Sequence, residues 1–210
     1  MIQAFKVGYD IVNLEGPGYE DSEIYVLLNQ AQDLEVLKEV FVRRWAFVSN
    51  LIVNETGSVS AGLSYSNTKS YTAQEEYLGY ISSKSKVTRA NFKIFASQWV
   101  ENIPIAKELS GKYVTNDVNR PILIQPRVYE DTAESITIIY DSNTTFAASN
   151  NFILEYVRKP LDISGTQDSE VNIALHERIV DTAVNLAKKV FNPSESSGSV
   201  QTDAMINKMM

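Results

Sequence analysis

The sequence contains no cysteine, and its 210 residues include a single histidine. Without cysteine the chain has no disulfide bond, no thiolate metal site and no thiol chemistry, and its redox compartment is left undetermined. No apolar run reaches the 18 residues that a membrane-spanning helix requires. The opening segment MIQAFKVGYD lacks a basic stretch followed by an apolar one, so no signal peptide is expected. We therefore expect no membrane partner.

Positive charge is also scarce, because 19 Lys and Arg stand against 26 Asp and Glu and give a net charge of −7. A surface of that sign repels phosphate backbones, so tight general DNA binding is not expected. The sequence has no run of basic residues with interleaved aromatic residues. Its charge suits a soluble protein, or a surface that lies close to DNA without binding it.

What the chain does have is a globular composition, with 44% apolar residues. A chain of this length can bury roughly 70% of its unfolded surface, enough for a core of its own. We expect one α+β domain over residues 1–192. The Ser-rich segment 193–210 has the composition of a segment without a core, and we expect it to dock on a partner or a neighbouring copy.

Helical periodicity is clearest near the two ends of the chain. It predicts a short helix over residues 2–14 and a long helix over 22–42, capped by Asp21 or Ser22. The apolar face of the long helix drifts along its length, which favours contact with more than one neighbour. A second helical segment is expected over residues 43–51.

The strongest amphipathic helix follows the strand FILEYVRKP and contains HERIVDTAVNLAKKVF. Its apolar residues fall within about 160° of a helical wheel, so one face is expected to be buried and the other exposed. These residues are Ile179, Val180, Ala183, Val184, Leu186, Ala187, Val190 and Phe191.

The middle of the chain has strand character. PILIQPRVYE, SITIIYDS and FILEYVRKP predict an antiparallel β-meander. The fold expected is therefore α+β, with a helical bundle from the N-terminal and C-terminal helices packed beside this meander. Between the helices and the meander we expect a closing turn at 54–57, followed by a loop or weak edge strands at 58–74. Two strands are expected at 77–81 and 86–89, joined by a turn at 82–85. A short strand at 92–96 and a helix over 97–109, interrupted by Pro104, are expected to follow.

The sequence offers no catalytic constellation, and no catalytic, cofactor-binding or metal-ligating residue is predicted. A nucleophile, a base and an orienting group must converge, and His176 is the only one of these that can be named. Glu170 is a weak candidate partner for His176, so a packing or capping role is the preferred interpretation. The stretch GSVSAG at residues 57–62 resembles a phosphate-binding loop, but no lysine follows its second glycine.

The chain has two pairs of adjacent basic residues, Arg43-Arg44 and Arg158-Lys159. We expect their side chains to be solvated or to form ion pairs between subunits, and contact with phosphate is the alternative. The partner-binding residues predicted from the sequence are Arg43, Arg44 and Trp45, together with Met205, Ile206 and Met209 in the C-terminal segment. Methionine suits such a contact because its flexible side chain adapts to irregular surfaces.

Three stretches taken together, PGYEDSEIYVLLNQAQ, YVRKP and HERIVDTAVNLA, carry a resemblance. Their order resembles the head-to-tail adaptor proteins of short-tailed phages, of the tail tubular protein A or gatekeeper type. Among these the chain looks most like the ring proteins of crAss-like phages that infect gut bacteria. The resemblance covers about half of the chain, and residues 59–116 match only in general character.

The resemblance implies a virion structural protein that is assembled in the host cytoplasm and is not an enzyme. Copies of such a protein, typically twelve, form a ring under the portal protein, extend the DNA channel without binding DNA specifically, and present a surface to the next tail or ring protein. Residues 21–51 and 174–191 would then form the bundle, and residues 120–158 the sheet. The Ser-rich extension after Asn192 departs from this pattern.

Two other functions remain open on the sequence alone. A tail-completion or tube-terminating protein shares the small α+β build, and it would assemble with the tail tube instead of the portal. A hydrolase or small-molecule-binding domain would require a deep pocket with convergent polar groups around His176 or Tyr140. A DNA-binding regulator is disfavoured by the negative charge.

Overall fold

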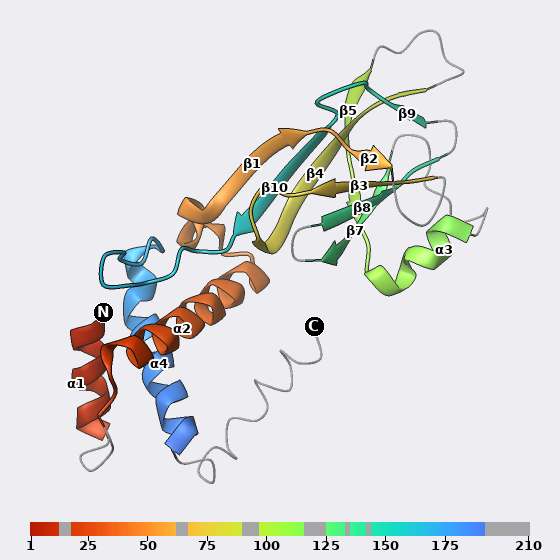
Figure 1. Cartoon of the computed structure of the whole chain (residues 1–210). Helices are drawn as coiled ribbons and strands as arrows, with labels where there is room; N and C mark the ends of the chain where they lie inside the picture. Colours follow the sequence, from red (N-terminus) through yellow and green to blue (C-terminus); the bar gives the residue numbers. More distant parts are fainter. Residues whose placement is uncertain are drawn as a thin grey trace. The chain divides into compact units, whose positions relative to one another are not determined.

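The computed structural model describes residues 1–12, 18–61, 67–89, 97–115, 125–132, 135–141 and 144–191 (Figure 1). The helices are α1 Ile2–Val12, α2 Asp21–Phe41, α3 Ser110–Thr115 and α4 His176–Phe191, and short 3-10 helices lie at Trp45–Phe47, Ser49–Leu51, Lys107–Leu109 and Ile173–Leu175. The strands are β1 Ile52–Gly57, β2 Ser60–Ala61, β3 Thr68–Thr72, β4 Tyr77–Arg89, β5 Gln98–Glu101, β6 Ile103–Pro104, β7 Arg127–Thr132, β8 Ser135–Ile139, β9 Thr144–Phe146 and β10 Phe152–Arg158.

The chain forms two compact units. The helical unit comprises Met1–Asn50 and Pro160–Met210, and the sheet unit comprises Leu51–Lys159. The sheet unit is thus an insertion between the two segments of the helical unit. The domain expected over residues 1–192 spans both units, and the extension expected over 193–210 lies outside the described residues.

The described residues of the sheet unit form two five-stranded sheets. In the first the order is β1-β10-β4-β5, with β9 also pairing with β4, and in the second it is β2-β3-β8-β7-β6. One core of buried residues draws on both sheets, with Phe152, Leu154 and Tyr156 from β10 and Ile136 and Ile138 from β8. Alternation along these strands sends every second side chain into that core.

The predicted arrangement of a helical bundle beside one antiparallel meander is wrong, although the chain is an α+β protein. β7 and β8 pair as expected, but β10 lies in the other sheet, between β1 and β4. Strands from 52 to 158 therefore build two sheets where one meander over 120–158 was expected. The error arises because β10 has two partners, β1 and β4, that lie about 100 and 70 residues earlier in the chain.

The turn predicted at residues 82–85 is also wrong, because β4 is one continuous strand from Tyr77 to Arg89. Its buried serines are satisfied by a neighbour: Asn102 donates from Nδ2 to Ser83 Oγ at 2.9 Å and accepts from Ser85 Oγ at 2.8 Å. The Tyr80 hydroxyl lies 3.0 Å from Ser83 Oγ. Buried hydroxyls cost little when they are hydrogen-bonded in this way, so a polar run can continue a strand.

Three further local predictions are wrong. The closing turn expected at residues 54–57 is part of strand β1, which pairs with β10. The helix expected over 97–109 is replaced by β5, β6 and a 3-10 helix, with α3 following. The N-cap of α2 is Glu20, whose backbone N–H donates to Glu23 Oε2 at 3.0 Å in a capping box, whereas Asp21 or Ser22 was expected. The strand expected at 92–96 lies outside the described residues.

In the helical unit, α1, α2 and α4 pack together, and α4 confirms the amphipathic helix predicted from its periodicity (Figure 1). Its buried residues include Ile179, Ala183 and Ala187, none of them measurably exposed. α1 contributes Phe5 and Tyr9, whose rings contact the ring of Tyr19 at centroid distances of 6.0 Å and 5.0 Å. Burial of such side chains is the main source of stability for this unit.

Two amide side chains of α2 attach the segment that precedes α4. Asn29 accepts from the backbone N–H of Ile163 at 2.7 Å and donates to the Ile163 carbonyl at 3.2 Å. Gln32, which is 1% exposed, donates to the Leu161 carbonyl at 3.0 Å and accepts from the Ser169 hydroxyl at 2.5 Å. The amides thus satisfy backbone groups of a segment that has no regular hydrogen-bonded structure.

Charge is divided unequally between the units. The sheet unit contains eleven Lys or Arg and eleven Asp or Glu, and the helical unit contains the remaining eight and fifteen. The whole net charge of −7 therefore belongs to the helical unit. A cationic surface on this unit consequently stands out from its surroundings.

Candidate partner-binding surface

The C-terminal end of α2 has a backbone conformation that normally takes glycine. The Arg44 N–H donates to the Glu39 carbonyl at 2.9 Å, and the Arg43 N–H donates to the Val40 carbonyl at 3.0 Å. These are the two hydrogen bonds of a Schellman motif, and they place Arg43 in the left-handed region with φ 57°. A side chain costs about 1–2 kcal/mol in that conformation, so arginine is locally less stable here than glycine would be.

Side chains around this turn are strongly exposed. Phe41 is 69% exposed and Val42 is 52% exposed, and Arg43 and Arg44 are exposed as well. The Arg43 guanidinium makes no hydrogen bond or ion pair with any residue that the structure describes. We call Phe41, Val42, Arg43 and Arg44 the α2 terminal patch. Adjacent large apolar and cationic side chains of this kind are typical of protein interaction sites.

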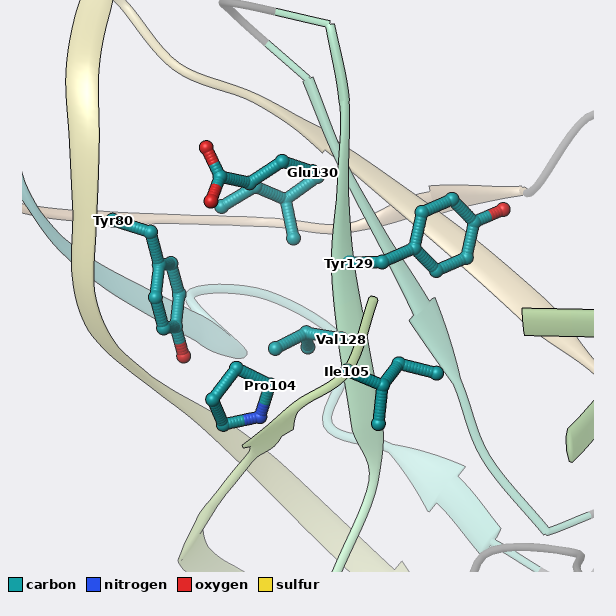
Figure 2. Close-up of a pocket in the computed structure, with 7 residues that line it drawn as sticks. Tyr80, Pro104, Ile105, Val128, Tyr129 and Glu130 are labelled. Carbon is teal, nitrogen blue, oxygen red and sulfur yellow. The ribbon is translucent and has the colours of Figure 1, made fainter. Parts of the chain in front are cut away.

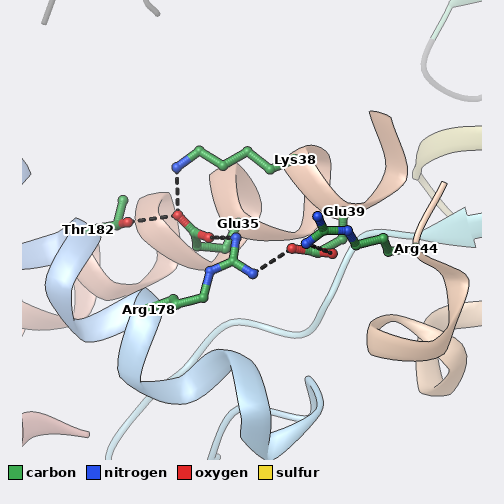
Figure 3. A network of polar contacts seen from close by, with 6 residues as sticks. All are labelled: Glu35, Lys38, Glu39, Arg44, Arg178 and Thr182. Atoms are coloured by element: carbon green, nitrogen blue, oxygen red, sulfur yellow. Dashed lines mark hydrogen bonds and ion pairs between the residues drawn. The ribbon is translucent and has the colours of Figure 1, made fainter. Parts of the chain in front are cut away.

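A network of ion pairs between α2 and α4 lies next to the patch (Figure 3). Arg178 of α4 lies between two carboxylates of α2, with Nη2 at 2.6 Å from Glu35 Oε2 and Nη1 at 2.5 Å from Glu39 Oε1. Glu35 is 2% exposed and Glu39 is 1% exposed. Glu39 also reaches Arg44 of the patch at 3.9 Å. The network therefore connects the patch to α4 through Glu39.

Glu35 receives two further contacts, from Lys38 Nζ at 2.6 Å and from the Thr182 hydroxyl at 2.7 Å. Desolvation by itself would raise the pKa of the Glu35 carboxyl. The hydrogen bonds from Lys38 and Thr182 and the charges of Lys38 and Arg178 outweigh that effect and hold its pKa below the ordinary value. The hydrogen bond with Glu39, reinforced by both carboxylate charges, raises the pKa of Arg178.

A pH dependence follows from the lowered pKa of Glu35. A carboxyl group whose pKa is lower in the folded state contributes stability that is present above its unfolded value and lost as pH falls through its folded value. The free energy of unfolding of the helical unit is expected to fall as pH drops below about 4.5, the ordinary value. Urea unfolding at a series of pH values measures this. Glu35→Gln should flatten the dependence, and an unchanged slope in that variant would contradict the assignment.

The strained conformation of Arg43 gives a second expectation. Arg43→Gly should stabilise the helical unit by about 1 kcal/mol, because glycine adopts positive φ without a steric cost. Arg44→Gly is the matched control. Arg44 has no positive φ to relieve, and its replacement removes the ion pair with Glu39, so this variant should be less stable than the wild type. Urea unfolding should show the two changes with opposite signs, and a loss of stability in Arg43→Gly would show that its side chain is structurally required.

The other sequence-predicted partner residues lie in different places. Trp45 is half-buried in the 3-10 helix that follows the patch, so it is less exposed than the four residues of the patch. Met205, Ile206 and Met209 lie outside the described residues. Phe41 and Val42 were not predicted as partner residues, although the drift of apolar residues around α2 was a signal for them.

The remaining candidates have structural partners. His176 Nε2 lies 3.0 Å from the Val171 carbonyl, so this nitrogen carries the hydrogen and donates it at the start of α4. Glu170 Oε1 accepts from the backbone N–H of Leu161 at 2.7 Å. Arg158 pairs with Glu75 at 3.6 Å, and Lys159 pairs with Glu76 at 3.9 Å. The second basic pair thus forms ion pairs inside the sheet unit.

A small hollow lies in the sheet unit, lined by Tyr80, Pro104, Ile105, Val128, Tyr129, Glu130 and Ile136 (Figure 2). Glu130 is exposed as a residue, but desolvation of its carboxyl group on the side of the hollow raises its pKa. The hollow has a volume of about 30 Å³, room for one or two water molecules. A site for an organic ligand is ordinarily about ten times larger, so this hollow is not the candidate site.

Within the described part of the chain, no cluster of three or more His, Asp or Glu side chains could hold a metal ion. No helix in those ranges has both the length and the apolar character needed to cross a membrane. Models of known protein families and curated protein sequences both give no match to this chain. The basis for a functional proposal is therefore the α2 terminal patch together with the sequence resemblance.

Proposed function

We propose that this chain is a phage head-to-tail adaptor, a virion structural protein whose copies form a ring under the portal protein. The observation that carries the proposal is the α2 terminal patch, where Arg43 has a left-handed backbone conformation that glycine adopts at lower cost, and its guanidinium makes no hydrogen bond or ion pair with any described residue. Non-glycine residues in such conformations cluster at binding and switch sites, so this observation favours a binding role for the turn. An adaptor requires such a role, because each copy must bind neighbouring proteins at fixed positions.

The charge distribution supports a position around a DNA channel. A ring that DNA must leave quickly cannot bind phosphates tightly, and the helical unit carries the whole net negative charge. In this proposal twelve copies extend the channel at the head-to-tail interface of the virion, and the far side of the ring receives the next tail or ring protein. A channel wall lined by Lys and Arg would contradict this part of the proposal.

Mass measurement tests the adaptor role. The purified chain is measured by native mass spectrometry, alone and mixed with the portal protein of the same phage. The mixture is expected to contain a complex of one portal ring with about one copy of this chain for each portal subunit. Binding to tail tube instead of portal would favour a tail-completion protein. A chain that remains monomeric in the presence of portal would overturn the proposal.

A further inference from the structure

α2 has apolar side chains on two faces. One face is buried against the helical unit, through residues such as Ile24, Leu28 and Ala31. On the opposite face Val26 is 55% exposed and Phe41 is 69% exposed, with Leu37 half-buried between them. At 100° per residue these three positions fall within about 60° of one another, so they lie on one side of the helix, with Gln30 and Asp33 between Val26 and Leu37.

Opposite charges gather at the two ends of the same helix. Glu20, Asp21 and Glu23 lie at its start, and Lys38, Arg43 and Arg44 lie at its end. The helix dipole favours this distribution of charge, but it does not account for exposed apolar side chains beside both groups. Each end of α2 therefore combines an apolar side chain with charge of one sign, Val26 with acidic groups and Phe41 with basic groups.

We propose that the two ends of α2 are the two halves of one head-to-tail contact between copies of this chain. In this contact Phe41 of one copy packs on Val26 of the next, and Arg43 of the first faces Glu23 of the second. The occupant is a second copy because the basic patch finds its complement, in charge and in apolar character, on the same helix.

The contact is heterologous, because the patch continues past the last turn of α2 into the turn at Val42 and Arg43 and so faces the end of the helix. When the end of one helix meets the side of the next, every copy still has one surface of each kind left, so the contact can propagate. It closes into a ring if the rotation from copy to copy completes a circle. This inference rests on the proposed function in one respect only, that copies of the chain assemble with one another.

Disulfide trapping tests the contact, because the chain has no cysteine of its own. A Ser22→Cys, Val42→Cys double variant keeps Val26, Phe41 and Arg43 in place. The two cysteines are separated by about 30 Å along α2, so they cannot join within one copy, since a disulfide needs Cα atoms within about 7 Å. Mild oxidation is expected to give a ladder of linked dimers, trimers and higher multimers on a non-reducing gel.

Three comparisons decide the result. Each single-cysteine variant can form dimers only, because it has one thiol per copy. The matched control is a Val7→Cys, Val42→Cys pair, whose first cysteine is equally accessible but lies on α1, outside the proposed contact; Val7 is 57% exposed. Adding Arg43→Glu to the test pair should slow ladder formation about tenfold, as loss of about 1.4 kcal/mol of binding would. Dimers alone would indicate antiparallel pairing of α2 helices and overturn the proposal. Monomers alone, or an equal ladder from the control pair, would overturn it as well.

The outcomes also separate this contact from the adaptor role. A ladder without a portal complex would leave the contact standing and overturn the proposed function. A portal complex without a ladder would leave the adaptor role standing and show that copies meet through another surface.

Discussion

An Arg178→Ala variant is expected to lose about 2–4 kcal/mol of stability in the helical unit. The change leaves Glu35 and Glu39 buried on α2 without their shared cation, and removal of one partner from a buried ion pair usually costs about 3–5 kcal/mol. We place the value lower because 42% of the Arg178 side chain is exposed, so water can enter and solvate the carboxylates. Urea unfolding followed by Trp45 fluorescence in a Trp99→Phe background reports on this unit alone, since the two tryptophans lie in different units.

Two controls show whether the stability lost in Arg178→Ala comes from burying unpaired carboxylates or only from removing the arginine side chain. Adding Glu35→Gln and Glu39→Gln to Arg178→Ala should recover part of the lost stability, because neutral amides are cheaper to bury than carboxylates. Lys6→Ala removes an ion pair whose side chains are 41% and 62% exposed, and it should cost less than about 1 kcal/mol. Equal effects of Arg178→Ala and Lys6→Ala would show that the carboxylates are solvated in the folded protein.

Gly57→Ala is expected to destabilise the sheet unit by about 1–3 kcal/mol, the usual cost of overpacking a core. A Cβ atom at this position would lie 2.7 Å from both Cε2 and the hydroxyl oxygen of Tyr71. The Tyr71 ring is 6% exposed and contacts the ring of Phe152 at a centroid distance of 4.7 Å, so it has little room to move. Urea unfolding followed by Trp99 fluorescence in a Trp45→Phe background measures the change.

Gly111→Ala is the matched control in the same unit. No atom lies within 4 Å of a Cβ built at Gly111, which belongs to α3, so alanine should stabilise this helix by up to about 1 kcal/mol. A Tyr71→Leu change, which removes the ring that the new methyl group meets, should make Gly57→Ala nearly neutral in that background. A large cost that persists there would assign the role of Gly57 to its backbone instead of to contact with Tyr71.

The elements that the sequence predicted are those whose pattern is complete within one segment. α4 needs only its own periodicity, because Ile179, Ala183 and Ala187 return to the same face every turn and bury it. α1 and most of α2 follow for the same reason. The pairing of β10 could not be predicted in this way, because its neighbours β1 and β4 come from distant parts of the chain.

A polar segment is also difficult to predict when the groups that satisfy it lie elsewhere in the sequence. Ser83 and Ser85 suggest a turn when β4 is considered alone, whereas in the structure the amide of Asn102, from the segment after β5, satisfies both hydroxyls within a continuous strand. At the candidate site, Arg43 and Arg44 were predicted from their charge. The drift of apolar residues around α2 pointed to a second contact face, but it did not identify Phe41 as exposed, because phenylalanine is usually buried.

The insertion of the sheet unit between the two helical segments sets an order for folding during synthesis. α2 leaves the ribosome early, but Arg178 follows Glu39 by 139 residues, about 7–28 s at ordinary translation rates. Strands β1 to β10 are all made in that interval, so the sheet unit can fold while α2 still lacks its partner helix. Glu35 and Glu39, whose cation Arg178 comes from α4, are therefore expected to keep this face of α2 charged and hydrated until α4 has been made.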